Sequence, residues 1–220
     1  MSITIIIIII TCLISVIAFS NQKMIDDLIF YPPAVANQNQ WYRFFTCGLI
    51  HADFAHLAFN MYALYLFGQY VEIKFLYIFG EKGKALYLVM YILALGACLI
   101  PTYSKNKNNY HYRSLGASGA VSAVVFAFIV FNPLQGLGLF FIPIYVAGFI
   151  FGFIYLFISG WLEKKNQGNV NHSAHIWGAI FGIAFVVVAG RLFSDTPVLG
   201  DFINQIINMD PSQIITFGRY

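Results

Sequence analysis

The chain carries a serine and a histidine inside two of its most apolar stretches. Ser118 lies in the run Gly116-Ala117-Ser118-Gly119 at the start of one stretch, and His175 lies near the start of another. Ionisable and polar groups cost free energy in hydrocarbon, so their presence there marks a candidate functional site. A serine hydroxyl beside an imidazole is the pair that nucleophilic hydrolysis uses, with the histidine as general base. The two residues therefore predict hydrolytic chemistry within a membrane.

The composition is that of an integral membrane protein. Of the 220 residues, 60% are hydrophobic and only 10% are charged, which is too apolar for a soluble domain of this length. Crossing about 30 Å of hydrocarbon takes roughly 20 residues in a helix. Long apolar runs without strict polar alternation favour helices over a β-barrel. We predict one all-α bundle with six spans, at Ile3–Phe19, Phe54–Val71, Lys84–Ile100, Gly116–Phe131, Leu137–Trp161 and Ala174–Phe193.

The remaining composition limits the other possibilities. We expect one transmembrane domain over residues 1–193 and a tail of unassigned role over residues 194–220. The first apolar run has no preceding basic residue and no clear cleavage site, so we interpret it as a retained span and not a secretion signal. Of the three cysteines, Cys12 and Cys98 lie inside spans, where packing is a better explanation than disulfides. The net charge of +3 is spread over the loops, which gives no support for nucleic-acid binding.

The basic residues do not settle the orientation in the membrane. With a cytoplasmic amino terminus, the cytoplasmic segments would hold five Lys and Arg residues and the outer segments seven. Cytoplasmic loops normally carry the excess of basic residues, so this count leans weakly toward the opposite orientation.

Four polar residues are expected at one depth. His56 and Asn60 lie in the first turns of the second predicted span, Ser118 in the first turn of the fourth and His175 in the first turn of the sixth. Even-numbered spans of a bundle start from the same side of the membrane, so these side chains should lie a short way below one surface. His56 and Asn60 are four residues apart and share a helical face. The alternative is a hydrogen-bonded pair that joins helices, worth on the order of 1 kcal/mol.

Small residues predict close packing of the fourth and sixth spans. They recur at helical spacing, as Gly119, Ala123 and Ala127 in the fourth and as Gly178 and Gly182 in the sixth. Such faces let two membrane helices approach closely, which a serine and a histidine need to come within about 2.6–3.2 Å of each other. Ordinary helix packing also explains the glycines, but it does not explain why His175 precedes them.

Each polar residue then has a possible role in hydrolysis. Ser118 would attack a peptide carbonyl, and His175 would take its proton and return it to the leaving amine. The N–H of Ser118, unpaired at a helix start, and the side chains of His56 and Asn60 could donate to the oxyanion. No acidic residue lies beside His175 in the sequence or at the same depth in another span, so we expect a dyad and not a triad.

The order of these motifs along the chain, from Trp41 to Gly182, resembles that of the rhomboid intramembrane serine proteases. A four-residue G-x-S-G alone would be weak evidence, whereas the ordered combination is specific. The motifs that resemble the family's are Trp41-Tyr42-Arg43 (W-x-R), His51 with His56-Leu57-Ala58-Phe59-Asn60 (H-x-x-x-N), Gly68 with Val71-Glu72, Gly116-Ala117-Ser118-Gly119 (G-x-S-G), and Ala174-His175 followed by Gly178 and Gly182.

The resemblance implies a function and a set of roles. It implies a six-helix core in a bacterial inner membrane, a cytoplasmic amino terminus, single-span membrane proteins as substrates, and neither metal nor organic cofactor. It makes Ser118 the nucleophile and His175 the base, with an oxyanion hole formed by His56, Asn60 and the Ser118 amide. The residues that it implies as structural support are Trp41 and Arg43 in a first loop at the membrane interface, His51, Glu72, Gly116, Gly119, Gly178 and Gly182. The oligomeric state stays open.

One position departs from the family pattern. Many family members carry an aromatic residue four positions after the nucleophile, stacked on the catalytic histidine, whereas this chain has Ser122. We therefore expect a hydrogen bond or a ring from another span to orient His175. The phenylalanines of the fifth span are expected to face lipid, with a movable gate as the alternative. His172 precedes His175 by three residues without any acidic ligand, which favours a loop histidine over a metal site.

Three other functions fit the sequence less well. A proteolytically silent rhomboid-like protein that binds membrane clients would not need both Ser118 and His175. A small transporter should show internal repeats and polar residues at mid-span, and neither is found in the sequence. An intramembrane aspartyl protease would need paired aspartates in two spans, which are also missing.

Overall fold

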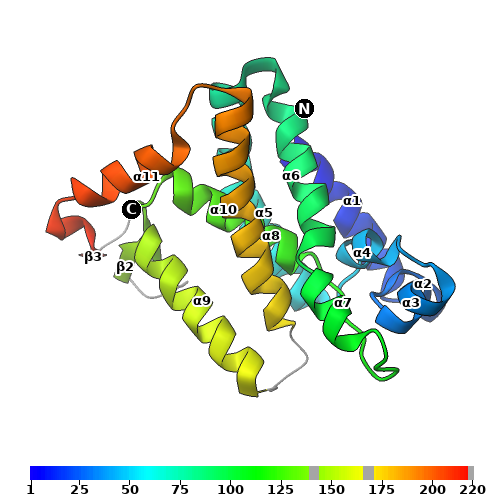
Figure 1. Ribbon diagram of the computed structural model, residues 1–220. Coiled ribbons are helices and arrows are strands. Elements are labelled where there is room, and N and C mark those ends of the chain that lie inside the picture. Colours follow the sequence, from blue (N-terminus) through cyan, green and yellow to red (C-terminus); the bar gives the residue numbers. More distant parts are fainter. Residues whose placement is uncertain (139–143, 166–170, 218–220) are drawn as a thin grey trace.

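The computed structural model describes residues 1–138, 144–165 and 171–217, which are mostly helical (Figure 1). The longer helices are α1 (Ile3–Ala18), α5 (Phe54–Phe79), α6 (Gly83–Ala97), α8 (Ser118–Phe131), α9 (Gly148–Lys165) and α10 (His172–Phe193). The shorter ones are α2 (Gln22–Leu28), α3 (Pro32–Gln38), α4 (Arg43–Thr46), α7 (Ile100–Asn106), α11 (Val198–Ile207) and the 3-10 turns η1 (Cys47–Leu49), η2 (Gly80–Lys82) and η3 (Pro211–Gln213).

Two described stretches have the length and hydropathy of membrane spans. Phe54–Asn106 has 53 residues and a mean hydropathy of 2.0, and His172–Phe193 has 22 residues and a mean hydropathy of 2.1. The first stretch turns at η2 and contains α5, α6 and α7, with α5 packed against α6. The helices α1, α8 and α11 are apolar but shorter. The chain is thus mostly helical, as predicted, although it also contains a three-stranded sheet and is not all-α. The six spans stay a prediction.

The predicted fifth span, Leu137–Trp161, is wrong at its start. Gly136–Gly138 form strand β1 and Ile144–Ala147 form strand β2, so that α9 begins only at Gly148. Residues 139–143 of this predicted span lie outside the described residues. Gly136 and Gly138 disfavour a helix, and the β-branched Ile144 and Val146 favour extended backbone. A short apolar run shows no periodicity that would distinguish a helix from a strand.

The two strands belong to an antiparallel sheet that also involves the tail. Strand β3 (Ile215–Phe217) pairs with β2, which gives the order β1-β2-β3. In the register, Leu137 faces Val146, and Tyr145 faces Thr216. The tail is therefore joined by backbone hydrogen bonds to the segment that leads into α9.

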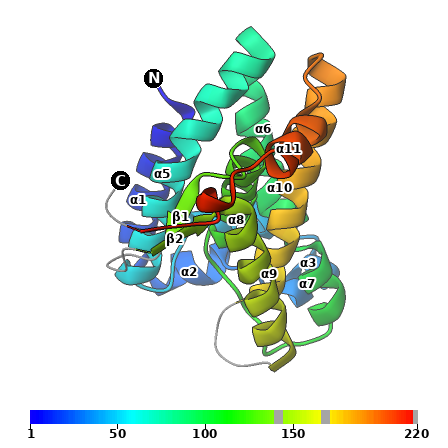
Figure 2. The same cartoon turned by 90° about the vertical axis from the view of Figure 1, so that its left-hand side faces the viewer.

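Helix α8 forms the centre of the bundle. All of its residues except Ser118 and Val125 are buried, and it packs against α5, α6, α9, α10 and α11. A helix that is apolar on every side is expected in such a position. Helix α9 lies at the edge, beside α10, while α2, α3 and α7 lie together at the end opposite the amino terminus (Figures 1 and 2).

Glu72, in the second half of α5, is joined to the amino-terminal end of α1. Its carboxylate accepts hydrogen bonds from the Ser2 hydroxyl (2.6 Å), from the N–H groups of Ile3 (2.8 Å) and Thr4 (3.0 Å), and from the Thr4 hydroxyl (2.9 Å). An acidic group at a helix amino terminus satisfies backbone donors that otherwise lack partners. Glu72 is therefore a helix cap, away from Ser118 and His175.

Candidate functional site

Ser118 and His175 meet where their helices begin. Ser118 is the first residue of α8 and His175 lies in the first turn of α10, and the distance from Ser118 Oγ to His175 Nε2 is 2.7 Å. The start of α10 is fixed by Asn171, whose side-chain oxygen accepts from the Ala174 N–H at 3.1 Å. A serine hydroxyl and an imidazole at this distance can exchange a proton.

Glycines bring the two helices together. A Cβ atom at Gly178 would collide with the backbone carbonyl oxygen of Gly119, and one at Gly182 would collide with that of Ala123. At Gly119 itself, a Cβ would collide with Cys98 Sγ. The backbones of α8 and α10 are therefore in direct contact at these positions, which places His175 beside Ser118.

The turn before Ser118 depends on Gly116. This residue has a φ of +109°, in the region that L side chains rarely adopt, and a Cβ there would lie 2.7 Å from His56 Cε1. The N–H of Gly116 donates to the carbonyl of Cys47 at 2.9 Å. The turn is thus shaped by glycine and held against the segment before α5.

His51 is fully buried behind this turn. Its Nε2 accepts from the Ala117 N–H (3.4 Å), and its Nδ1 lies 3.0 Å from the hydroxyl of Ser15, which in turn donates to the Leu49 carbonyl (2.8 Å). Since the Ser15 proton is already donated, Nδ1 of His51 must donate to Ser15. Burial, and then His56 nearby, lower the pKa of His51 from 6.5 to about 4, against an opposing effect of Asp53. The ring is therefore neutral at pH 7.

His56 and Asn60 share one face of α5. The ring of His56 lies against Gly116, and its Nδ1 accepts from the Ala52 N–H at 3.5 Å, so a neutral ring carries its proton on Nε2. Asn60 is buried, and its Nδ2 donates to the carbonyl of His56 at 2.9 Å, which leaves the second N–H of that amide group for another acceptor. Both side chains thus carry donors on the helix face that bears His56.

Tyr155 of α9 is a neighbour of His175 that sequence reasoning missed. Its ring stacks on that of His175, with centroids 6.3 Å apart and an angle of 22° between the planes. Its hydroxyl lies 2.9 Å from the hydroxyl of Ser122, the residue that stands where an aromatic was expected. The ring on His175 therefore comes from another helix. The only hint in the sequence was a hydroxyl within an apolar, phenylalanine-rich stretch.

Trp41 and Arg43 hold the first loop and lie apart from the Ser118–His175 pair. The buried Arg43 donates through Nη1 to the carbonyls of Asp26 (2.8 Å) and Ile29 (2.7 Å). Trp41 stacks on Phe44, with centroids 5.9 Å apart and an angle of 10°. The hydrogen bonds of Arg43 connect α4 to α2, whereas the Trp41 contact lies within the segment around α4.

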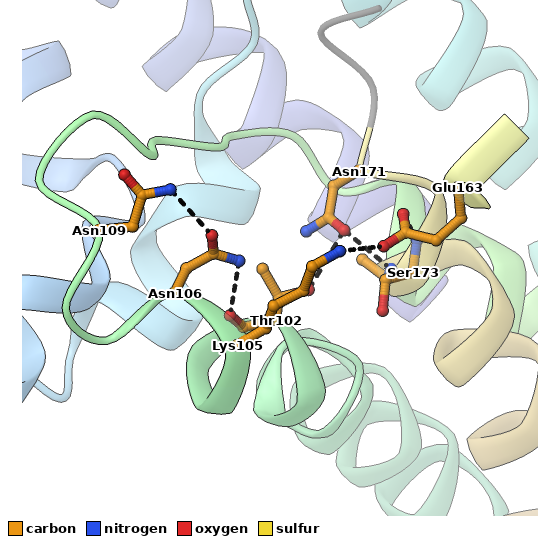
Figure 3. A network of polar contacts seen from close by, with 8 residues as sticks. Thr102, Lys105, Asn106, Asn109, Glu163, Asn171 and Ser173 are labelled. Carbon is orange, nitrogen blue, oxygen red and sulfur yellow. Dashed lines mark hydrogen bonds and ion pairs between the residues drawn. The ribbon is translucent and has the colours of Figure 1, made fainter. Parts of the chain in front are cut away.

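A polar network joins α7, α9 and α10 next to the site (Figure 3). Lys105 forms an ion pair with Glu163 at 3.1 Å, and the other carboxylate oxygen of Glu163 accepts from the Ser173 N–H, also at 3.1 Å. The Thr102 hydroxyl donates to the side-chain oxygen of Asn171 at 3.2 Å. The carboxyl end of α9 is therefore attached to the turn that precedes His175.

Two further features concern small ligands. A cavity of about 20 Å³ is lined by Ser118 together with Ser114, Gly119 and Asn171, and it has room for about one water molecule. Among the described residues, no group of three or more His, Cys, Asp or Glu side chains could hold a metal ion, so His172 and His175 lack further ligands there.

Comparison with known proteins decides the family. The sequence profile of the Rhomboid domain matches residues 38–192. The chain belongs to the rhomboid family of membrane proteins. The family membership that the motifs predicted is thus confirmed. The matched region of this rhomboid protein includes Ser118, His175, His56 and Asn60, whereas α11 and β3 lie beyond it. The division of the chain at residue 193 stays a prediction.

Individual relatives agree with this family. The rhomboid chain is 29% identical over 159 residues to "Putative rhomboid protease YdcA" of Bacillus subtilis (strain 168), across 71% of each protein. It is 30% identical over 177 residues to Rhomboid-like protein 11, chloroplastic, of Arabidopsis thaliana, across 76% of this chain and 58% of the relative. It is also 30% identical over 148 residues to RHOMBOID-like protein 12, mitochondrial, of the same plant, across 61% of this chain and 42% of the relative.

Proposed function

We propose that this chain is an intramembrane serine endopeptidase that cleaves transmembrane segments of single-span membrane proteins. The observation that carries the proposal is the 2.7 Å distance between Ser118 Oγ and His175 Nε2, from two helices in backbone contact. Membership of the rhomboid family supports it. Ser118 and His175 are then a catalytic dyad.

The reaction proceeds through an acyl-enzyme. His175 Nε2 takes the proton of Ser118 as Oγ attacks the carbonyl carbon of the scissile peptide bond. When the tetrahedral intermediate collapses, the C–N bond breaks and the amine leaves with the proton from His175. Water then gives a proton to His175 and attacks the ester, and the proton returns to Ser118 as the carboxyl product forms.

Three donors serve the oxyanion in this proposal. They are the N–H of Ser118, which as the first residue of α8 has no partner within its helix, the Nε2–H of His56 and the amide of Asn60. Fixed donors of this kind lower the barrier because they need no reorganisation as the charge develops.

In this proposal the helices that carry the dyad lie in a lipid bilayer. Large apolar side chains such as Phe153 (72% exposed) and Phe157 (76% exposed) point away from the bundle, as lipid-facing residues would. We assign six spans, a cytoplasmic amino terminus and a bacterial plasma membrane. The dyad then lies toward the outer surface, where water can reach it.

The test uses purified protein in liposomes with a panel of model single-span substrates. Wild type is expected to cleave at least one substrate, and Ser118→Ala and His175→Ala should each reduce turnover by about 10³-fold or more while thermal unfolding stays unchanged. Mass spectrometry of the products locates the cut. Unchanged turnover by Ser118→Ala would overturn the dyad.

A second readout separates the protease from a silent client-binding protein. A serine-directed phosphonate should label the wild type and leave both variants unlabelled. Retention of a single-span protein without either cleavage or labelling would favour the silent alternative.

A further inference from the structure

The hydroxyl of Tyr155 is linked to α8 through Ser122. The Ser122 hydroxyl donates to the carbonyl oxygen of Ser118 at 2.8 Å, and its oxygen lies 2.9 Å from the Tyr155 hydroxyl. Because a serine has one proton to donate, the Tyr155 hydroxyl is the donor in the second bond. The ring that stacks on His175 is therefore anchored to the same α8 turn that carries the nucleophile.

We propose that Tyr155 is a positioning residue that orients His175 toward Ser118, which makes α9 part of the active site. The inference rests on the proposed function, because it concerns the orientation of the base in that reaction. Tyr155 contacts His175 and not the reacting bond, so its effect is exerted through the imidazole.

The other contacts of the imidazole explain why a ring matters. Within the described part of the chain, Ser118 is the hydrogen-bond partner of His175, so a carboxylate does not restrain the second ring nitrogen there. The rings of His172 and His175 are arranged edge to face, with centroids 5.8 Å apart and an angle of 81° between the planes. The Tyr155 ring stacks on the His175 ring, with centroids 6.3 Å apart and an angle of 22°. Centroid separations of about 4.5–7 Å are those at which aromatic rings attract each other. His172 belongs to the same helix as His175, so Tyr155 supplies the restraint from outside α10.

The restraint depends on where α9 lies. The buried residues of α9 are Gly148, Gly152 and Ser159, and much of the remaining helix is exposed or half-buried. Its carboxyl end is attached through Glu163 to Lys105 and Ser173, and its amino end continues from β2. Any displacement of α9 from α8 and α10 would therefore take the ring away from His175 and break the bond to Ser122. The dyad is fully oriented only when α9 is packed.

Three variants separate positioning from packing. Tyr155→Leu removes the ring, Tyr155→Phe keeps it without the hydroxyl, and Phe157→Leu removes a neighbouring aromatic that is 76% exposed. Tyr155→Leu should lower kcat about tenfold or more and leave KM within about twofold of the wild-type value. A displaced catalytic group slows the chemical step but does not weaken substrate binding. Tyr155→Phe should retain kcat within about threefold, and Phe157→Leu should behave like wild type.

Labelling of Ser118 by a serine-directed phosphonate gives a second readout that needs no substrate. Its rate should fall in Tyr155→Leu and stay near the wild-type rate in Tyr155→Phe and Phe157→Leu. A rise in KM at unchanged kcat would overturn the proposal in favour of substrate contact by Tyr155. Equal losses in Tyr155→Leu and Phe157→Leu would overturn it in favour of general packing of α9.

The outcomes also separate this inference from the proposed function. If wild type is active and Tyr155→Leu is equally active, the positioning role of Tyr155 is wrong, whereas the proposed function stands. If correctly folded wild type neither cleaves a substrate nor is labelled by the phosphonate, both the proposed function and the positioning role are wrong.

Discussion

At the scale of single residues, the Ser118–His175 pair relies on neighbours that do no chemistry themselves. His51 accepts from the Ala117 N–H and donates to Ser15 of α1, so it fixes the backbone one residue before Ser118. This arrangement needs an uncharged ring, because a protonated Nε2 would present a second donor to the Ala117 N–H. The position of Ser118 therefore depends on the protonation state of a buried histidine.

His51 leads to a prediction about pH. Its pKa is about 4 in the folded protein and 6.5 ordinarily, so between these values the unfolded chain binds more protons. The stabilising contribution of the neutral ring is complete above pH 6.5 and declines as the pH falls to about 4, by up to about 3 kcal/mol. Thermal unfolding in detergent between pH 7 and pH 4 should show a steeper loss in wild type than in His51→Gln, whose amide does not titrate. Parallel curves for the two proteins would contradict this.

The residue scale also shows what the sequence could reveal. Ser118 and His175 were predictable because polar groups are conspicuous in apolar helices. Tyr155 was not, because a tyrosine among Phe151, Phe153 and Phe157 looks like one more lipid-facing ring. Which of these aromatics turns inward is set by the rotation of α9 against α8 and α10, and that is a tertiary property.

At the scale of helices, the contact between α8 and α10 brings Ser118 and His175 within hydrogen-bond distance. The absence of a side chain at Gly178 lets α10 touch the carbonyl oxygen of Gly119, one residue after Ser118. The glycine spacing in the sequence indicated this approach. The start of α9 was not predictable in the same way, because strand β2 continues directly into an apolar helix and local hydrophobicity does not distinguish them.

Gly178→Ala tests the contact. The added methyl group collides with backbone, which cannot rotate away as a side chain can, so α10 must shift from α8. We expect a loss of about 1–3 kcal/mol in stability and a fall in kcat of about tenfold or more as Oγ and Nε2 separate. The matched control is Gly160→Ala in α9, where a Cβ meets nothing within 4 Å. Thermal unfolding and cleavage rates of both variants should be compared, and similar behaviour would refute the argument.

At the scale of the whole molecule, α9 is attached to the rest of the fold near both of its ends. One attachment is the Glu163 network at the end near His175, and the other is the sheet, in which the tail strand β3 pairs with β2 (Figures 1 and 3). The tail lies beyond the residues that match the family profile, and its sequence alone did not indicate a partner. Pairing between strands about 70 residues apart is a product of the fold, so only the structure could reveal it.

Removal of residues 209–220 tests the second attachment. The deletion takes away η3 and β3, and with them the bond from the Ala147 N–H to the Ile214 carbonyl at 2.9 Å. Because Ala147 directly precedes α9, we expect amide hydrogen exchange at Ile144–Ala147 and in the first turn of α9 to become about tenfold faster, with α5 unchanged. Phe217→Ser is the matched control, since that side chain is 78% exposed and its replacement leaves the backbone pairing in place. If these amides exchange at the same rate in the deletion variant, in Phe217→Ser and in the full chain, the sheet does not restrain α9. The position of Tyr155 then depends on the packing of α9 against α8 and α10, including the bond to Ser122, and on the Glu163 end.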